Sequence, residues 1–441
     1  MAIVGAGPSG LAALRALRRA GLDAVAFERG ERIGGVWTRE DRSTAAYRTL
    51  HLITSRERTE YGELTMPEGT PDYPPRDAVG SYLEEYADRF GLSEFVRVRT
   101  EVVRADRTQA KPRGGWQLAF ADGSSAEFDY LVAANGHNEE PVWPDPPYPG
   151  ASEFVGRQLH ALEYDEPSPF AGQRVMVVGM GNSAMDIVTD LSHVAARTIL
   201  SVRHGSWVIP KRLLGKPADQ VVKPFMAVHV PWQIRQPLSQ TLLRVVTGPP
   251  ERYGLPAPDS GLFQSHPTIT DTVLSRISHG RIAPKPGIES FSAEGVTFVD
   301  GSSEPLDAVV WCTGYRVTIP FLDESIVGAD PKELRLFMRV FHPRVPDLFF
   351  VGLMQSTGSA FPIVERQSEL LADYLTGRYV PPSPRAMRSA VERRYRRALK
   401  RWGPGGRPAM RVDFDRFMYD LGRELERGRR RAARRNGAAA P

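Results

Sequence analysis

Two glycine-rich turns in this chain each follow a short apolar run and precede a helix-like pattern. They span residues 5–10, GAGPSG, and residues 179–184, GMGNSA. In such a turn the first glycine permits a tight bend, the second lets a pyrophosphate approach the backbone, and the third small residue lets helix and strand pack closely. The N-terminus of the helix that follows attracts phosphate. The sequence therefore predicts two dinucleotide-binding units, an organisation that suggests an enzyme.

The two units differ in the residue that ends their second strand. The strand expected at residues 24–27 ends in Glu28, whose carboxylate can accept hydrogen bonds from both hydroxyls of an unphosphorylated ribose. The corresponding strand of the second unit ends in Arg203 and His204, and a cation there suits a 2′-phosphate. We therefore expect FAD at the first turn and NADPH at the second, with Lys211 and Arg212 as further cations for the phosphate. An Arg203 that only caps the strand and faces solvent is the alternative.

The order of strand, turn, helix and strand around each glycine turn predicts an α/β fold with parallel sheets. A further strand at residues 348–351 and a helix at 363–375 follow the second unit and need a partner sheet. The first unit is the natural partner, so we expect two Rossmann-like dinucleotide-binding domains in three-layer form, the NADPH domain inserted into the FAD domain, with a helical C-terminal extension. The expected boundaries are 1–150 for the first part of the FAD-binding domain, 151–315 for the NADPH-binding domain, 316–380 for the second part of the FAD-binding domain and 381–441 for the basic helical extension.

Length and composition narrow the possibilities. The chain has 441 residues, of which 41% are hydrophobic and 25% are charged, an ordinary globular composition. A single cysteine excludes an internal disulfide, and no run of about 18 apolar residues predicts a membrane span. Because no secretory leader precedes the first strand, we expect a cytoplasmic protein. Residues 205–270, rich in proline and aromatic residues, are the least legible part of the sequence.

The C-terminal stretch carries most of the positive charge. Residues 385–441 hold 18 lysines and arginines against 6 acidic residues, whereas the preceding residues hold 39 against 46. Such a tail can attract nucleic acid or a membrane surface. Its arginine pairs alternate with apolar residues at helical spacing, however, which favours a solvated helix face. We expect a small-molecule substrate and O₂ as partners, no nucleic acid, no membrane span and no metal, and the sequence leaves a homodimer open.

A third motif lies between the two units, at residues 154–164, FVGRQLHALEY, with the spacing FxGxxxHxxxY. Together with both glycine turns and residues 34–37, GGVW, it closely resembles the flavin-containing monooxygenases, class B single-component flavoenzymes related to the Baeyer–Villiger monooxygenases. The resemblance covers nearly the whole chain. Further landmarks of that family are matched by Tyr82-Leu83, Tyr86-Ala87, Gly136-His137, residues 201–207, Thr313-Gly314-Tyr315 and residues 352–367.

This resemblance implies an NADPH- and FAD-dependent monooxygenase. In that family NADPH reduces FAD, O₂ adds to give a C4a-(hydro)peroxyflavin, and this species oxygenates a small organic substrate, here expected at a nucleophilic nitrogen or sulfur, while NADP⁺ stays bound. The flavin carries the chemistry and the protein supplies orientation and a dry cavity. His160 matches the fingerprint histidine, and the resemblance implies that it couples movement between domains rather than transferring a proton.

The turns and the resemblance together give a set of expected cofactor-binding residues. They are Gly5, Gly7, Pro8, Ser9, Gly10, Glu28, Arg29, Gly35, Val36, Trp37, Thr54, Val102, Val103, Ala134, Asn135, Gly136, Gln355, Gly179, Gly181, Asn182, Ser183, Ala184, Arg203, His204, Thr313, Gly314 and Tyr315.

One departure from the family pattern concerns the substrate. The N-oxygenating members carry an asparagine beside the flavin after a Tyr-x-x-Leu-like lead, and counting from Tyr47 and Leu50 places Ile53 at that position. An aliphatic side chain cannot donate a hydrogen bond to the oxygenated flavin. His51 and Thr54 are the candidate catalytic residues that would substitute for it.

Three other functions remain as alternatives. A Baeyer–Villiger oxygenation of a carbonyl substrate keeps both cofactors, although the third motif ends in Tyr164-Asp165 and not in the Trp-Pro expected of the type I enzymes. A two-dinucleotide reductase acting on a disulfide needs a Cys-x-x-Cys pair, and Cys312 is the single cysteine. A module that binds flavin only as a structural or sensing ligand is the third alternative.

Overall fold

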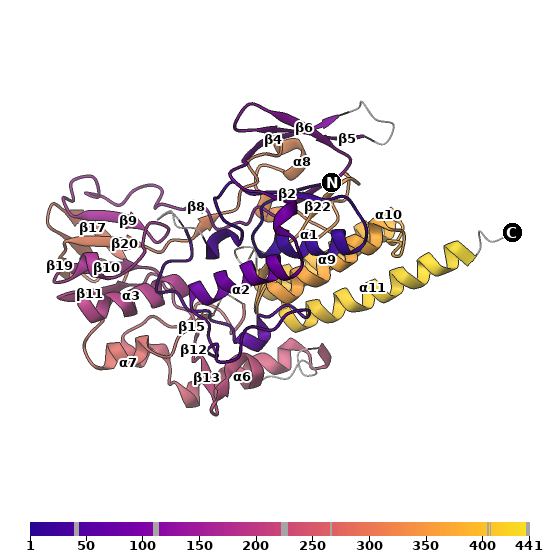
Figure 1. Cartoon of the computed structure of the whole chain (residues 1–441). Coiled ribbons are helices and arrows are strands. Elements are labelled where there is room, and N and C mark those ends of the chain that lie inside the picture. The colour runs from indigo at the N-terminus through magenta and orange to yellow at the C-terminus, as the bar shows by residue number, and fades with distance from the viewer. Residues whose placement is uncertain are drawn as a thin grey trace. The chain divides into compact units, whose positions relative to one another are not determined.

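The computed structural model describes residues 1–38, 44–108, 114–221, 228–264, 267–403, 405 and 407–437. The chain forms two compact units, each coloured by position in the sequence in Figure 1. Unit 1 comprises Met1–Glu40, Arg56–His137 and Val317–Pro441, and unit 2 comprises Asp41–Ser55 and Asn138–Arg316. Residues 44–55, expected in the first domain, therefore belong to unit 2 by their contacts.

Unit 1 is built on a five-stranded parallel sheet in the order β22-β7-β1-β2-β3. Its strands are β1 (Ala2–Val4), β2 (Val25–Phe27), β3 (Val96–Arg97), β7 (Leu131–Ala133) and β22 (Leu348–Phe350). The first and last segments of the unit meet in this sheet, because β22 pairs with β7. This pairing confirms that the strand expected at 348–351 returns to the sheet of the first glycine turn.

Two helices of unit 1 pack against each other beside this sheet. Helix α1 (Pro8–Arg19) follows the first glycine turn, and α9 (Phe361–Leu375) follows β22. In α1 Leu11, Leu14 and Leu17 are fully buried, at the spacing of three residues that places them on one face of a helix. Pro8 stands at the first helical position, where its fixed φ and missing N–H cost nothing.

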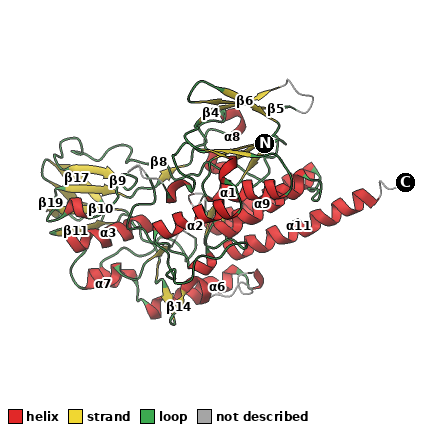
Figure 2. Cartoon of the chain, in the orientation of Figure 1, coloured by secondary structure: helices red, strands yellow, loops and turns green. Residues whose placement is uncertain are grey.

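The rest of unit 1 consists of an antiparallel sheet and further helices (Figure 2). Strands β4 (Val102–Thr108), β5 (Gly115–Phe120) and β6 (Ser125–Phe128) form the sheet, and a turn at Asp122-Gly123 joins the last two. The remaining elements are η1 (Gly35–Trp37), η2 (Arg56–Arg58), α2 (Arg76–Arg89), η3 (Ser93–Phe95), α8 (Glu324–Val327), η6 (Pro331–Glu333), β23 (Gln355–Ser356), α10 (Pro384–Trp402), β24 (Arg411–Val412) and α11 (Phe414–Gly437). Helices α10 and α11 are the expected C-terminal extension, and α11 packs against α9.

Unit 2 repeats the plan with a second five-stranded parallel sheet, in the order β16-β11-β10-β20-β9. Its strands are β9 (Arg157–His160), β10 (Arg174–Val178), β11 (Arg197–Ser201), β16 (Ala283–Lys285) and β20 (Ala308–Trp311), and helix α3 (Asn182–Val194) follows β10. The inner strands are almost fully buried, as expected of a parallel sheet covered on both faces. Two Rossmann-like sheets, one inserted in the chain of the other, confirm the predicted fold class.

Smaller elements complete unit 2. They are β8 (Glu140–Pro141), η4 (Ser168–Phe170), β12 (Val208–Ile209), β13 (Arg212–Leu213), β14 (Lys216–Pro217), α4 (Ala218–Val221), α6 (Trp232–Val246), η5 (Pro250–Tyr253), β15 (Thr268–Ile269), α7 (Val273–Ser278), the antiparallel strands β17 (Ile288–Ser292), β18 (Gly295–Phe298) and β19 (Ser303–Pro305), and β21 (Tyr315–Arg316). Strand β11 ends at Ser201, two residues before Arg203, so Arg203 follows the strand and does not terminate it. Among the described helices none is long and apolar enough to cross a membrane.

Candidate dinucleotide sites

The first glycine turn joins β1 to α1 by a backbone path that only glycine permits. Gly5 has φ of 99°, and a Cβ there would lie 2.6 Å from the carbonyl oxygen of Ala134. A Cβ on Gly10 would lie 1.9 Å from the carbonyl oxygen of Gly5. The packing of the helix on the strand and of the turn on β7 therefore requires both glycines, with or without a ligand.

Gly7 stands in the same turn for a different reason. Its φ of −73° and ψ of −171° suit any residue, and a Cβ there would lie 3.6 Å from the Cα of Gly35, an ordinary contact. The protein's own packing thus leaves room for a side chain that the sequence does not have. Gly7 is also the N-cap of α1 and has no side-chain cap, so N–H groups of the first turn of that helix can bind a phosphate.

Glu28 follows β2 and is 7% exposed. One carboxylate oxygen accepts a hydrogen bond from the backbone N–H of Ala6 and the other from that of Gly30, each at 2.8 Å. The carboxylate is thereby held beside the glycine turn, and each oxygen keeps a lone pair for a ribose hydroxyl. Arg29, also an expected site residue, is exposed.

The loop at residues 34–37 lies against the same turn. Gly34 has φ of 120° and donates its backbone N–H to the carbonyl of Ala6 at 3.0 Å. A Cβ on Gly35 would meet the Cα of Gly7 at 3.0 Å, so the two backbones nearly touch. The structure therefore brings Gly35 to the first turn, and Val36 and Trp37 follow it in η1.

The other expected residues of unit 1 divide into two groups. Ala134 and Asn135 lie at Gly5, and the side-chain amide of Asn135 donates to the carbonyl oxygens of Gly136 and Thr318 at 3.2 Å each. On the far side of the turn, a Cβ on Gly352 would lie 2.1 Å from Oγ of Ser9, which brings the chain leading to Gln355 close to the start of α1. In contrast, Val102 packs in the core with Val4 and Phe27, and Val103 is 47% exposed.

In the second glycine turn, as in the first, packing requires the first glycine but leaves room for a side chain at the second. Gly179 has φ of 127°, and a Cβ there would lie 2.8 Å from the carbonyl oxygen of Cys312, the residue that follows β20. Gly181 has φ of −78°, and a Cβ there would meet nothing within 4 Å. Ala184, in the first turn of α3, is fully buried, and Oδ1 of Asn182 accepts from the backbone N–H of Ile269 at 2.8 Å. Gly181 thus leaves an open approach to the N-terminus of α3.

Positive charge stands beside this second turn. Arg203 and His204 are both exposed, and the guanidinium of Arg203 makes no ion pair or hydrogen bond with any described residue. Nδ1 of His204 lies 2.9 Å from Oδ2 of Asp259. The two other expected cations have partners: Lys211 Nζ donates to the carbonyl of Leu52 at 3.3 Å, and Arg212 donates to that of Gly215 at 3.1 Å.

His160 and Tyr315, two of the motif residues, pack together in unit 2. Their ring centroids are 5.3 Å apart, edge to face, and His160 is fully buried. Nδ1 of His160 accepts from the backbone N–H of Leu162 at 3.1 Å. Burial lowers the pKa of His160, and the backbone of Gly314 opposes this shift. The lowered pKa favours the neutral imidazole. Thr313 donates its hydroxyl to the carbonyl of Val142.

A cluster of side chains that is not among the predicted site residues joins the segment at residues 44–55 to α3. Tyr47 donates its hydroxyl to Asp186 at 3.0 Å, and Thr49 donates to Asp190. Tyr164 also donates to Asp190, at 3.3 Å. Asp186 and Asp190 are four residues apart, hence on one face of α3, and this spacing is the signal in the sequence that would have revealed the pair.

This cluster encloses a carboxylate with an unusual pKa. Burial raises the pKa of Asp186 to about 6, against the opposing effects of Lys211 and the hydrogen bond from Tyr47. Burial likewise raises the pKa of Asp190. The candidate catalytic residue His51 lies on the same segment, where it is exposed and its Nδ1 is 3.0 Å from the carbonyl oxygen of Thr49. A charged group kept in such surroundings destabilises the fold, which favours a functional reason for its presence.

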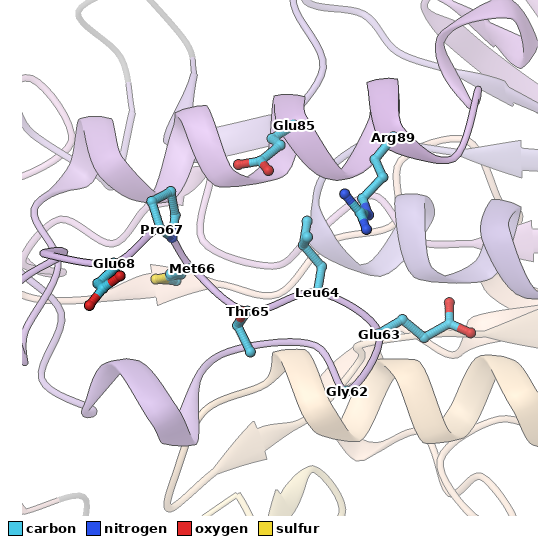
Figure 3. Close-up of a pocket in the computed structure, with 9 residues that line it drawn as sticks. All are labelled: Gly62, Glu63, Leu64, Thr65, Met66, Pro67, Glu68, Glu85 and Arg89. Atoms are coloured by element: carbon cyan, nitrogen blue, oxygen red, sulfur yellow. The ribbon is translucent and has the colours of Figure 1, made fainter.

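A separate pocket of about 450 Å³ opens on unit 1 (Figure 3). Glu85 and Arg89 project into it from α2, and the chain at residues 62–68 forms the opposite wall. No residue of either glycine turn lines it. The described residues also contain no group of three or more His, Cys, Asp or Glu side chains arranged to hold a metal.

The raised pKa of Asp186 gives a testable prediction. Because its folded pKa of about 6 lies above the usual value of 3.8, the carboxylate destabilises the fold as pH rises from about 4 to about 6 and above. Asp186→Asn keeps an oxygen for Tyr47 and removes that charge. We expect the variant to be more stable than the native chain at pH 8, with the advantage smaller by about 1 kcal/mol at pH 5. Urea unfolding at both pH values measures this, and an advantage independent of pH would contradict it.

Comparison with known proteins agrees with this geometry. The family model described as "FMO-like: Flavin-binding monooxygenase-like" matches residues 1–427. Flavin-containing monooxygenase 3 of Rattus norvegicus is 30% identical over 442 residues, covering 96% of this chain and 82% of that protein. Dimethylaniline monooxygenase [N-oxide-forming] 2 of Mus musculus is 29% identical, with 96% and 82% covered.

Solved structures show the same fold. The S-allyl-L-cysteine S-oxygenase of Allium sativum superposes with a TM-score of 0.70 at 26% identity, covering 97% of this chain and 88% of that one. An oxidized steroid monooxygenase bound to NADP superposes with a TM-score of 0.75 at 18% identity, covering 97% and 98%. The chain is accordingly an oxidoreductase that uses FAD and NADPH. It belongs to the flavin-binding monooxygenase-like family, as a flavin-dependent monooxygenase.

Proposed function

We propose that this monooxygenase transfers one oxygen atom of O₂ to a nucleophilic nitrogen or sulfur of a small organic substrate. The observation that carries the proposal is the contrast between the two glycine turns, one beside the buried carboxylate of Glu28 and the other beside the exposed cation of Arg203. This contrast supports FAD as the ligand of unit 1 and NADPH as the ligand of unit 2. The names of two similar proteins, an N-oxide-forming monooxygenase and an S-oxygenase, support nitrogen or sulfur as the acceptor.

FAD fits the first turn because Gly7 leaves open the approach to the N-terminus of α1, where backbone N–H groups would bind the pyrophosphate. Glu28 would orient the ribose, and residues 34–37 would pass close to the cofactor. When bound, the flavin supplies the activation of O₂ and the transfer of oxygen. The chain's own residues bind and orient the cofactors and keep water from the reacting centre.

NADPH fits the second turn on the same physical grounds. Gly181 leaves the N-terminus of α3 open, and Asn182 and Ser183 form the first residues of that helix. Arg203 would pair with the 2′-phosphate, and its lack of a protein partner leaves the guanidinium available for that role. His160 stays neutral and would act by packing, next to Tyr315, rather than as an acid.

The acceptor atom is where the chain departs most from its family. Ile53 stands at the position of the family asparagine and offers no hydrogen bond, so His51 and Thr54 are the proposed catalytic contacts on this segment. The hydrogen bond from Tyr47 to Asp186 would hold the segment that carries His51 and Thr54 in place. The same departure keeps Baeyer–Villiger oxygenation of a carbonyl substrate as the second candidate function.

We further propose that unit 1 forms the FAD-binding domain and unit 2 the NADPH-binding domain, with residues 381–441 of unit 1 as a basic extension that binds no nucleic acid. The single cysteine supports a cytoplasmic location, since the chain has no disulfide to maintain. A homodimer stays a proposal that gel filtration tests.

Replacing glycines of the first turn should separate folding from FAD binding. Gly7→Ala adds a methyl group where the protein has room, so we expect unchanged stability of the FAD-free protein but at least roughly tenfold weaker FAD binding. Gly10→Ala should instead lower the stability of the FAD-free protein by about 1–3 kcal/mol, since its Cβ meets the carbonyl of Gly5. Urea unfolding and flavin fluorescence titration measure the two effects. A yellow Gly7→Ala protein with native FAD affinity would refute the placement.

Replacing Arg203 should discriminate between the two nicotinamide cofactors. We expect Arg203→Ala to weaken NADPH binding by about 1.5–3 kcal/mol, the value of a charged hydrogen bond, and to leave NADH nearly unaffected. The measurement is flavin reduction by each cofactor under anaerobic conditions, as a function of concentration. Equal losses with NADPH and NADH would mean that Arg203 does not bind the 2′-phosphate.

The acceptor atom is tested with a panel of substrates. Amines and sulfides should stimulate aerobic NADPH consumption and give N-oxides or S-oxides by mass spectrometry, whereas ketones should give no esters. Esters from ketones without oxides from amines or sulfides would favour the Baeyer–Villiger candidate. A protein that stays colourless with FAD, or that consumes no NADPH in air, would contradict both.

A further inference from the structure

A loop of unit 2 at residues 256–260 lies locked against the chain that follows β11. Gly205 forms a parallel β-bridge with Pro258, and the indole N–H of Trp207 donates to the carbonyl of Ser260 at 2.8 Å. A Cβ on Gly205 would lie 2.0 Å from the carbonyl oxygen of Ala257, so the two backbones are in close contact. The loop therefore has a fixed position beside Arg203 and His204.

This fixed loop presents Asp259 to the imidazole of His204. Nδ1 of His204 lies 2.9 Å from Oδ2 of Asp259, and since a carboxylate only accepts, the ring N–H donates. The side chains are 65% and 56% exposed, respectively. The hydrogen bond fixes which ring nitrogen faces the loop, and it leaves Nε2 for another partner. The next residue toward the N-terminus is Arg203, whose guanidinium is likewise without a partner among the described residues.

We propose that Asp259 is a positioning residue for the 2′-phosphate of NADPH, and that it acts by holding His204 as a second phosphate-binding group beside Arg203. In its imidazolium form His204 donates from both ring nitrogens, to the carboxylate through Nδ1 and to a phosphate oxygen through Nε2. Arg203 supplies a planar pair of donors to the same dianion. The proposal rests on the NADPH assignment of unit 2 and extends it to a loop outside the glycine turn.

Asp259 could instead weaken binding of the 2′-phosphate, and this effect can be distinguished from the proposed one by experiment. A carboxylate that approached the phosphate without an intervening imidazole would repel it, and removing the carboxylate would then strengthen binding. An ion pair between two exposed side chains also contributes little to folding stability. A role of Asp259 in stability alone would affect ligands with and without the 2′-phosphate equally.

The experiment compares adenosine 2′,5′-bisphosphate with 5′-AMP, which differ only in the 2′-phosphate, by calorimetric titration of the FAD-loaded protein. In Asp259→Asn the amide oxygen can still accept from Nδ1, but the side chain is neutral and no longer stabilises the imidazolium that donates through Nε2. We therefore expect this variant to bind the bisphosphate roughly five- to tenfold more weakly, as for loss of one hydrogen bond to a phosphate, and to bind 5′-AMP unchanged. His204→Ala should have an effect at least as large. Asp259→Glu, which keeps the carboxylate, should weaken binding of the bisphosphate less than Asp259→Asn does.

The double variant tests whether Asp259 acts through His204. In a His204→Ala background, Asp259→Asn should cause no further weakening, because the group that it positions is gone. In steady state Asp259→Asn should raise KM for NADPH with little change in kcat, and leave KM for NADH unchanged. Glu153→Gln, which removes an exposed carboxylate elsewhere in unit 2, is the matched control and should change none of these values.

The outcomes distinguish the role of Asp259 from the NADPH assignment of unit 2, on which it rests. Tighter binding of the bisphosphate to Asp259→Asn, equal weakening of both ligands, or additive losses in the double variant would overturn the role of Asp259. If Arg203→Ala weakens the bisphosphate but neither His204→Ala nor Asp259→Asn does, the NADPH assignment stands without this inference. If the native protein does not prefer the bisphosphate over 5′-AMP, the assignment itself fails.

Discussion

Contact between backbone atoms at the two glycine turns is the constraint on which both units depend. In each turn the first glycine lies so close to the carbonyl of the residue after the adjacent strand, Ala134 after β7 or Cys312 after β20, that no side chain fits. This closeness brings the N-terminus of the following helix over the carboxyl ends of the parallel strands, where open α/β sheets bind ligands. The fold and the two sites thus share one geometric origin. Packing within the protein does not require the second glycine of each turn, because there is room for a side chain at Gly7 and at Gly181.

Most of this framework could be predicted from local sequence patterns. Both parallel sheets, the helices after the turns and the return of β22 to the first sheet follow from apolar runs, glycine spacing and the need of a strand for a partner. The strand ending was less accurate: β11 stops at Ser201, because the backbone leaves the sheet before Arg203. Resemblance to a family supplied the chemistry, which the spacing of the turns alone does not specify.

What the sequence did not reveal depends on contacts between distant residues. The carboxylate of Asp259 is 55 residues from His204, in a stretch without helical or strand periodicity, so no local pattern connects them. Tyr47 and Asp186 are 139 residues apart, and their hydrogen bond explains why residues 44–55 join unit 2. In both cases the side chains that determine a site lie in segments whose position is fixed by tertiary packing and not by propensity.

The division of the chain into segments also determines which unit is synthesised completely first. The chain passes between the two units after residues 40, 55, 137 and 316, so neither unit is a continuous stretch. On a ribosome, all of unit 2 is made by residue 316, whereas unit 1 still lacks the strand at Leu348–Phe350 that closes its sheet edge. Until then β7 has an unpaired edge, the kind of surface that invites wrong partners. The sheet of unit 1 therefore stays incomplete after every segment of unit 2 has been made, and premature termination shortly after residue 316 would leave unit 1 without β22 and the helices that follow it.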